Sequence, residues 1–176
     1  YKPMQAPIKL LSYRPPSALL EHRVVLVTGA GQGLGKALAL ASAALGAHVI
    51  MHGRGAAKLE KTYDEIVAAS HAKPAIAPLD FAVARDLDYE RLAQTIGDEF
   101  GRLDGVVHCA AWLPRLQPLA QEKLDDWLAL LRINLAGPFA LTRACLPLLC
   151  RSEDASVIFT SESHGKSART ISSLPD

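Results

Sequence analysis

A run of four apolar residues, 24–27, leads directly into a turn rich in glycine. Such a short, continuously apolar run is typical of a strand buried on both faces of a parallel sheet. A helical stripe follows from Leu34 to Leu45, and Gly46 supplies its end signal. Strand, glycine turn and helix in this order predict a phosphate-binding turn at 28–35, because unpaired N–H groups and the positive end of the helix dipole meet there.

Strands and helices continue to alternate after this unit. Further strands are predicted at residues 47–51, 75–79, 106–110 and 157–159. Strands that alternate with helices pair in parallel through right-handed crossovers. The pattern therefore predicts a single-domain α/β fold, a doubly wound Rossmann-type parallel sheet of order 3-2-1-4-5 with later strands missing. The helical stripe from Leu124 to Leu135 is expected to break at Gly137-Pro138.

Domain boundaries follow from the same pattern. Residues 1–22 contain prolines and basic residues without a clear period, which predicts an N-terminal arm. Residues 23–165 form the predicted Rossmann dinucleotide-binding domain. Residues 166–176 show no periodicity and are expected to form an irregular tail.

Composition and charge exclude several classes of partner. The chain has 176 residues, of which 49% are hydrophobic, and its net charge of +1 gives no electrostatic reason to expect nucleic acid or a membrane surface. No apolar run has the length of a membrane span or the character of a signal-peptide core. Three cysteines without a C-x-x-C pair predict neither a disulfide framework nor a zinc site. We therefore expect no metal, reduced thiols and a cytoplasmic location.

The glycine turn supplies the first candidate binding residues. Gly29 is expected to permit the tight turn, Gly33 to let the backbone approach a pyrophosphate, and Gly35 to let helix and strand pack without a side chain between them. The alternative is a glycine-rich loop that binds nothing. The candidate residues in the turn are Gly29, Gly31, Gln32, Gly33, Leu34 and Gly35.

The spacing Thr-Gly-x-x-x-Gly-x-Gly, which starts at Thr28, resembles the short-chain dehydrogenase/reductase family rather than the Gly-x-Gly-x-x-Gly of other dehydrogenases. The apolar run before the turn, the helix that contains Asn134, and the segment Phe159-Thr160-Ser161-Glu162-Ser163 carry the resemblance further. It extends over residues 23–165, and the arm is similar to that of a bacterial YciK-like subgroup. The resemblance implies hydride transfer between a nicotinamide cofactor and a small carbonyl or alcohol substrate.

The end of the second predicted strand indicates which dinucleotide binds. NAD enzymes of this fold place a carboxylate there for the ribose 2'-hydroxyl, whereas this chain has His52-Gly53-Arg54. Arg54 could form a charge-assisted pair with a 2'-phosphate, so NADP(H) is favoured over NAD(H). The alternative is a solvated loop arginine, which would leave the choice of cofactor open.

The resemblance implies further cofactor contacts after the third and fourth strands. Asp80 would contact the adenine through its carboxylate with help from the backbone N–H of Phe81, unless Asp80 forms an Asx-type turn or a helix cap. The segment 108–111 stands where the family has Asn-Asn-Ala-Gly, and its small alanines would admit the cofactor. His108 and Cys109 are expected to be core residues rather than ligands. The candidates in this segment are Cys109, Ala110 and Ala111.

The catalytic groups that the resemblance implies are only partly present. Asn134 matches the family asparagine that completes a water relay, unless it caps the end of its helix. Glu162 stands at the position of the catalytic serine, but an ionised carboxylate cannot donate a hydrogen bond unless burial raises its pKa. Strand alternation should point Ser161 and Ser163 to the opposite face. A role for Ser161 or Ser163, a role for Glu162, and no catalytic role all remain open.

The Tyr-x-x-x-Lys pair of the family is missing. All four tyrosines precede Asn134, and none is followed by lysine four residues later. We expect that the catalytic part lies outside these residues, through shortening of the chain or omission of disordered residues. The first hypothesis is an NADP-dependent oxidoreductase. The alternatives are a non-catalytic dinucleotide-binding regulatory protein of the same fold and a Rossmann domain for a nucleotide sugar or another ligand.

Two helices are predicted to carry apolar side chains on more than the one face that packs on the sheet. They lie at residues 124–135 and 139–149. Apolar surface of this kind marks contacts between subunits. A homodimer or homotetramer is therefore predicted.

Overall fold

Five parallel strands form one sheet in the computed structural model, which describes residues 13–70, 73–115 and 117–161. The strand order is β3-β2-β1-β4-β5, as predicted from the sequence. The strands are β1 (Val24–Thr28), β2 (His48–Gly53), β3 (Ala75–Pro78), β4 (Gly105–His108) and β5 (Ser156–Phe159). The helices are α1 (Gly33–Ala44), α2 (Ala56–Ser70), α3 (Asp86–Phe100), α4 (Leu124–Leu131) and α5 (Gly137–Leu149), with a 3-10 turn η2 (Leu119–Gln121) and a π-helical segment η3 (Arg132–Ala136).

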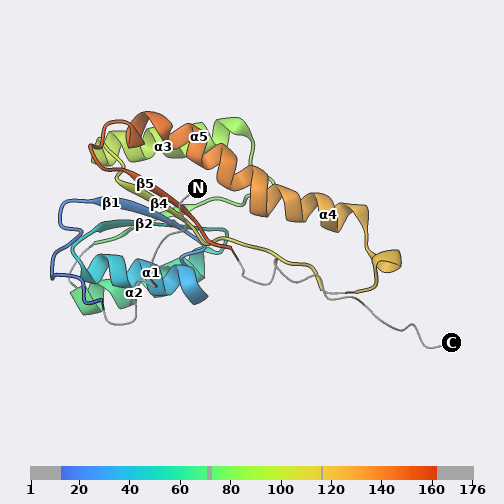
Figure 1. Ribbon diagram of the computed structural model, residues 1–176, viewed down its shortest axis with the longest axis horizontal. Helices are drawn as coiled ribbons and strands as arrows, with labels where there is room; N and C mark the ends of the chain where they lie inside the picture. The colour runs from blue at the N-terminus through green and yellow to red at the C-terminus, as the bar shows by residue number, and fades with distance from the viewer. Residues whose placement is uncertain (1–12, 71–72, 116, 162–176) are drawn as a thin grey trace, which may run out of the picture.

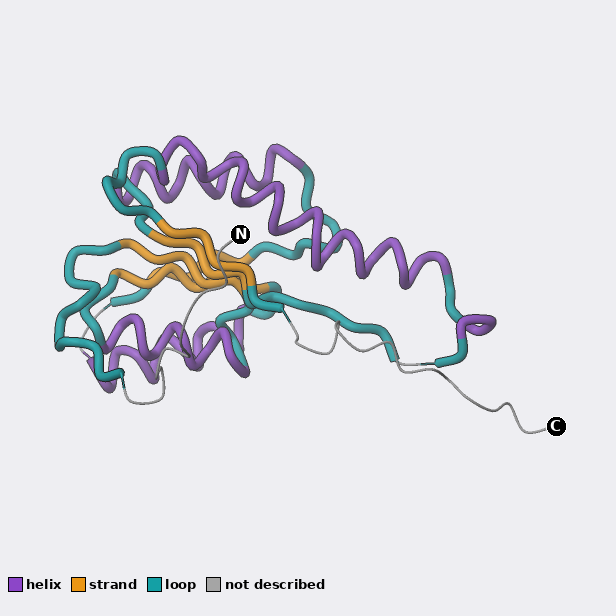
Figure 2. Tube along the Cα trace, viewed as in Figure 1, coloured by secondary structure: helices purple, strands orange, loops and turns teal. Residues whose placement is uncertain are grey.

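Helices cover both faces of the sheet. Figure 1 shows α1 and α2 on one face and α3 and α5 on the other, and Figure 2 shows the strands as the middle layer. The Rossmann-type α/β fold is therefore confirmed. In the described ranges, none of the helices combines the length and the apolar character that a membrane span needs.

The apolar run that opens the domain forms the centre of the core. All five residues of β1 are buried. Leu26 packs in the cluster that includes residues of α3 and α5, whereas Val27 packs in the cluster that includes residues of α1 and α2. Because helices cover both faces, the successive side chains of residues 24–27 are all apolar instead of alternating with polar ones.

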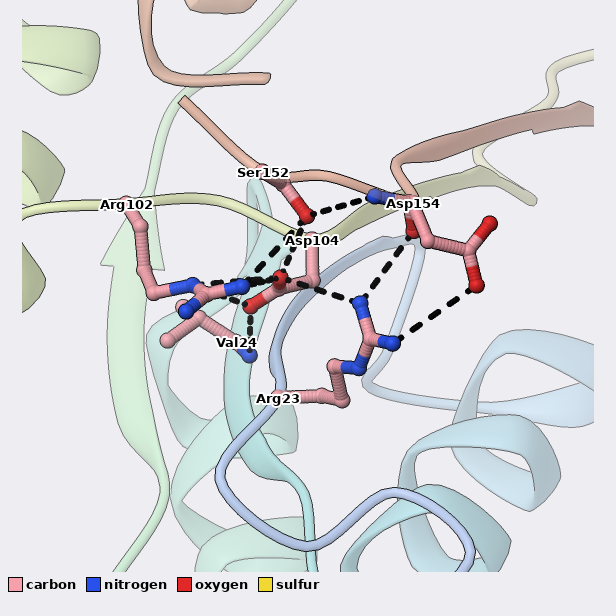
Figure 3. A network of polar contacts seen from close by, with 6 residues as sticks. All are labelled: Arg23, Val24, Arg102, Asp104, Ser152 and Asp154. Atoms are coloured by element: carbon pink, nitrogen blue, oxygen red, sulfur yellow. Dashed lines mark hydrogen bonds and ion pairs between the residues drawn. The ribbon is translucent and has the colours of Figure 1, made fainter. Parts of the chain in front are cut away.

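A network of polar contacts fixes the amino ends of the central strands (Figure 3). The Asp104 carboxylate, just before β4, accepts hydrogen bonds from the Val24 N–H at 2.9 Å and the Ser152 hydroxyl at 2.6 Å. It also accepts bonds from Arg102 and, at 3.3 Å, from Arg23. Burial alone would raise the pKa of Asp104, but the hydrogen bonds from Arg102, Ser152 and Val24 outweigh burial and hold the pKa at about 2. The network thus ties β1, β4 and the turn before β5 together.

The predicted helix break at Gly137-Pro138 is wrong. The helix continues from α4 through η3 into α5, and Gly137 has helical angles of φ −61° and ψ −53°. The Gly137 N–H donates to the carbonyl of Arg132, five residues earlier, which is the wider hydrogen-bonding pattern of a π-helix. Pro138 follows this wider turn directly and is the second residue of α5. Gly137 instead permits close packing, since a Cβ there would lie 2.6 Å from Cγ of Phe81.

The apolar stripe on α4 is not covered by any of the described residues. In Figure 1 this helix extends beyond the sheet and away from the helices that cover it. The strand β5 also exposes apolar side chains at the edge of the described sheet. The exposed side chains are Leu124, Trp127, Leu128, Leu131, Leu135 and Phe139 along the helices, and Val157, Ile158 and Phe159 on β5. The predicted association of subunits through these helices stays a prediction.

Candidate functional site

A cleft of about 530 Å³ lies at the carboxyl ends of the strands. The segments that follow β1, β2, β3 and β4 form its walls, because the carboxyl ends of parallel strands meet at one edge of a sheet. Every residue predicted from the sequence to bind a cofactor lines this cleft. These are Gly29, Gly31, Gln32, Gly33, Leu34, Gly35, Arg54, Asp80, Phe81, Cys109, Ala110 and Ala111.

The turn after β1 is fixed against the segment after β4. Gly29 has a φ of +69°, and a Cβ on it would lie 2.9 Å from the backbone of Ala110. Thr28 Oγ1 accepts two hydrogen bonds, each 3.0 Å long, from the N–H groups of Cys109 and Ala110. The tight turn predicted for Gly29 is therefore present, and these contacts join two walls of the cleft.

The start of α1 is open towards an anion. Gly33 has a φ of +56°, and a Cβ on it would meet nothing within 4 Å. Gln32 makes no side-chain cap, and the first turn of α1 contains no acidic residue. Unpaired N–H groups and the positive end of the helix dipole are thus not neutralised from within this helix, which suits a bound phosphate.

Gly35 allows α1 to pack on the turn, as the sequence predicted. A Cβ there would lie 2.4 Å from the Gly29 carbonyl oxygen and 3.0 Å from that of Thr28. Both atoms belong to the backbone, so the turn would have to move to accommodate any side chain. The shape of the turn therefore depends on a glycine at this position.

The segments after β2 and β3 carry the charged candidates. Arg54 is exposed on the cleft and makes no ion pair with any carboxylate in the described part of the chain. Asp80 Oδ1 accepts a hydrogen bond from the Ala82 N–H at 2.9 Å, so the Asx-type turn proposed as its alternative role is present. That turn uses one of its two carboxylate oxygens. Contact with an adenine therefore stays a prediction for Asp80.

Two buried histidines lie near the cleft, and one of them, His52, lines it. His52 stacks on Phe81 with ring centroids 4.5 Å apart, and neither of its ring nitrogens has a hydrogen-bond partner among the described residues. His108 shares a hydrogen bond with the Thr142 hydroxyl through Nε2 and stacks on Phe159. Burial lowers the pKa of each histidine to about 4, with a further lowering at His52 from His108 and an opposing effect from Asp80. The core position predicted for His108 is confirmed, whereas Cys109 lines the cleft.

We expect these histidines to make the fold sensitive to mild acid. Their folded pKa of about 4 lies below the ordinary value of 6.5, so unfolded chains bind more protons and stability falls as pH drops from 6.5 towards 4. At about pH 5 the loss is about 2 kcal/mol for each histidine. Urea denaturation at neutral pH and at pH 5 measures the loss of stability between the two pH values. This loss should be about 2 kcal/mol smaller in His52→Leu than in the wild-type protein. The exposed His48→Gln is the control, and an unchanged pH dependence in His52→Leu would contradict this account.

Asn134 holds the segment that follows β4. Its Oδ1 accepts a hydrogen bond from the Trp112 N–H, and its Nδ2 donates one to the Trp112 carbonyl, each 2.8 Å long. Asn134 lies within η3 in the middle of a continuous helix, so the alternative that it caps a helix end is wrong. The water relay stays a prediction. Ser161 is exposed, and Glu162 and Ser163 lie outside the described residues.

Sequence reasoning missed two polar residues of the cleft, His52 and Lys58. His52 is a polar side chain at the end of a buried strand, which was a visible signal of a special position. Lys58 lies in the first turn of α2, where acidic residues are the usual choice. In the described part of the chain, no three His, Cys, Asp or Glu side chains gather as metal ligands would.

Comparisons with known proteins agree with this geometry. The model of the short chain dehydrogenase family matches residues 23–173. The "Uncharacterized oxidoreductase YciK" of Escherichia coli K12 is 36% identical over 159 residues, which are 90% of this chain and 63% of that protein. This chain thus spans less than two thirds of that relative.

Solved structures give the same result. A putative short chain dehydrogenase from Pseudomonas syringae is 44% identical with a TM-score of 0.86, over 90% of this chain and 65% of that one. A putative short chain dehydrogenase from Shigella flexneri, complexed with NADP, is 36% identical with a TM-score of 0.84, over 88% of this chain and 64% of that one.

Proposed function

The chain belongs to the short chain dehydrogenase family, and on that premise we propose that it forms the NADP(H)-binding part of an oxidoreductase. The reaction is hydride transfer between the nicotinamide and a small carbonyl or alcohol substrate. The observation that carries the proposal is the cleft itself, which both the glycine turn and Arg54 line.

The choice of NADP(H) rests on charge at the end of β2. Arg54 follows that strand, and neither Gly53 nor Gly55 offers the carboxylate that would accept a bond from a ribose 2'-hydroxyl. A guanidinium without a carboxylate partner keeps its donors available for a 2'-phosphate. The NADP complex of the Shigella flexneri relative supports the same choice.

The residues of this chain have distinct parts in the proposed function. The cofactor, when bound, supplies the hydride chemistry. The start of α1 binds the pyrophosphate through backbone N–H groups, and Asp80 faces the adenine end. Asn134 holds Trp112 and so positions the wall nearest the substrate. The same proposal gives Asn134 a place in a proton relay. The candidates for orienting the substrate are Ser161, Glu162 and Ser163.

A second candidate function is dinucleotide binding without catalysis. Its support is Glu162, which stands where the family has a serine. NADPH binding without NADPH oxidation over a panel of aldehydes and ketones would favour this candidate. Oxidation of NADPH by any member of the panel would favour the oxidoreductase.

Location and assembly complete the proposal. The cysteines of the described residues are free thiols, which suits a cytoplasmic protein. The uncovered apolar stripe of α4 suits contact with a second copy in a homodimer or homotetramer.

Replacing Arg54 with alanine tests the choice of cofactor. We expect the Kd for NADPH to rise about tenfold, because one charge-assisted hydrogen bond to the 2'-phosphate is lost, while the Kd for NADH stays unchanged. Fluorescence titration of both cofactors measures this. The control is Arg91→Ala on α3, an exposed arginine outside the cleft. Wild-type protein that binds NADH as tightly as NADPH, or an equal loss for both cofactors in Arg54→Ala, would refute the proposed specificity.

A further inference from the structure

Lys58 lies on the same wall of the cleft as Arg54, in the first turn of α2. Its Nζ donates a hydrogen bond of 2.6 Å to Oε1 of Gln32, which belongs to the glycine turn. The stem of Lys58 also packs against that turn, since a Cβ on Gly31 would lie 2.9 Å from Cβ of Lys58. The ammonium group is therefore held between α2 and the glycine turn.

The charge around Lys58 is unbalanced. No acidic residue occupies the first turn of α2, and neither Lys58 nor Arg54 makes an ion pair in the part of the chain that the structure describes. By contrast, Lys36 of α1 makes an ion pair of 2.7 Å with Glu65, which lies two turns further along α2. A carboxylate thus pairs with a lysine elsewhere between these helices, whereas in the described part of the chain no carboxylate, Asp80 of the cleft included, pairs with Lys58.

We propose that Lys58 is a second cation of the 2'-phosphate site and that Gln32 is its positioning residue. An ammonium group has three donors, of which Gln32 uses one, so the others remain available for phosphate oxygens. Arg54 and Lys58 then bind the dianion from two sides, and the start of α2 adds the positive end of its dipole. This inference rests on the proposed function, because only a cofactor with a 2'-phosphate engages Lys58.

The test is Lys58→Met, which keeps the packing of the stem and removes the charge. The Kd values for NADPH, NADH, adenosine 2',5'-bisphosphate and 5'-AMP are measured by titration on the purified protein. We expect the Kd for NADPH and for the bisphosphate to rise about three- to tenfold, the range for one charged contact at an exposed site. The Kd for NADH and 5'-AMP should stay unchanged, and Lys58→Arg should recover most of the NADPH affinity.

The matched control is Lys61→Met, which removes an exposed lysine from the same helix but outside the cleft. A change of less than about threefold in the NADPH to NADH ratio of Lys58→Met overturns the inference, as does an equal loss for both cofactors. Wild-type protein without preference for NADPH would instead overturn the proposed function. The two failures are therefore distinguishable in one set of titrations.

Discussion

Gly35→Ala is expected to weaken NADPH binding by about a hundredfold, because its methyl group would force the phosphate-binding turn out of position. The nearest atoms to the added Cβ are backbone atoms of Gly29 and Thr28, none of which belongs to a flexible side chain. Overpacking of this kind costs about 3 kcal/mol at its upper end, and each 1.4 kcal/mol is about tenfold in affinity. Titration with NADPH, together with urea denaturation, measures both consequences.

Gly55→Ala is the control for the added methyl group. Its Cβ would meet nothing within 4 Å and its φ is not positive, so the free energy of unfolding should stay the same or rise slightly. Gly35→Ala that unfolds at the wild-type urea concentration and keeps wild-type NADPH affinity would show that the turn tolerates a side chain.

Asp104→Ala is expected to lower the free energy of unfolding by about 3 kcal/mol or more. The Asp104 side chain is 2% exposed, and its removal leaves the buried Val24 N–H without its carboxylate acceptor. The folded pKa of about 2 lies below the ordinary 3.8, so this stabilisation is present above pH 4 and is lost as pH falls from about 4 to 2. Urea denaturation at neutral pH and across that acid range measures both effects.

The control for Asp104 comes from the same network. Asp154 contacts Arg23 at 3.6 Å, but its side chain is 82% exposed, so Asp154→Ala should cost less than about 1 kcal/mol. If both variants lost the same free energy of unfolding, the larger contribution of the buried Asp104 would be contradicted. Affinity for NADPH should change little in a folded Asp104 variant, because the network lies at the amino ends of the strands and the cleft at their carboxyl ends.

The parallel sheet and its cleft were predictable from the sequence. A continuously apolar strand such as β1 requires cover on both faces, and regular alternation of strands with helices leaves few topologies. Once the strands are parallel, the residues that follow them must converge at one edge. For this reason Arg54, Asp80 and Ala110, which are far apart in the sequence, line one cleft as expected.

Other features depend on contacts that local patterns do not reveal. The helix break at Gly137-Pro138 was predicted from the ordinary effect of proline, but a π-helical turn absorbs the missing N–H and Phe81 occupies the space beside Gly137. The contact between Lys58 and Gln32 joins residues 26 positions apart. The buried Asp104 network joins residues 80 and 81 positions apart, and the pattern of the sequence does not pair Asp104 with Arg23 or Val24.

The hydroxyl of Thr28 joins two walls of the cleft, the turn after β1 and the segment after β4. It bonds the N–H groups of Cys109 and Ala110, and Asn134 bonds both backbone groups of Trp112 a short way along the same segment. These bonds join the glycine turn, the segment after β4 and η3 to one another. In the proposed function, the spacing between the phosphate-binding turn and the wall at Trp112 is therefore fixed by hydrogen bonds within the protein before any dinucleotide binds.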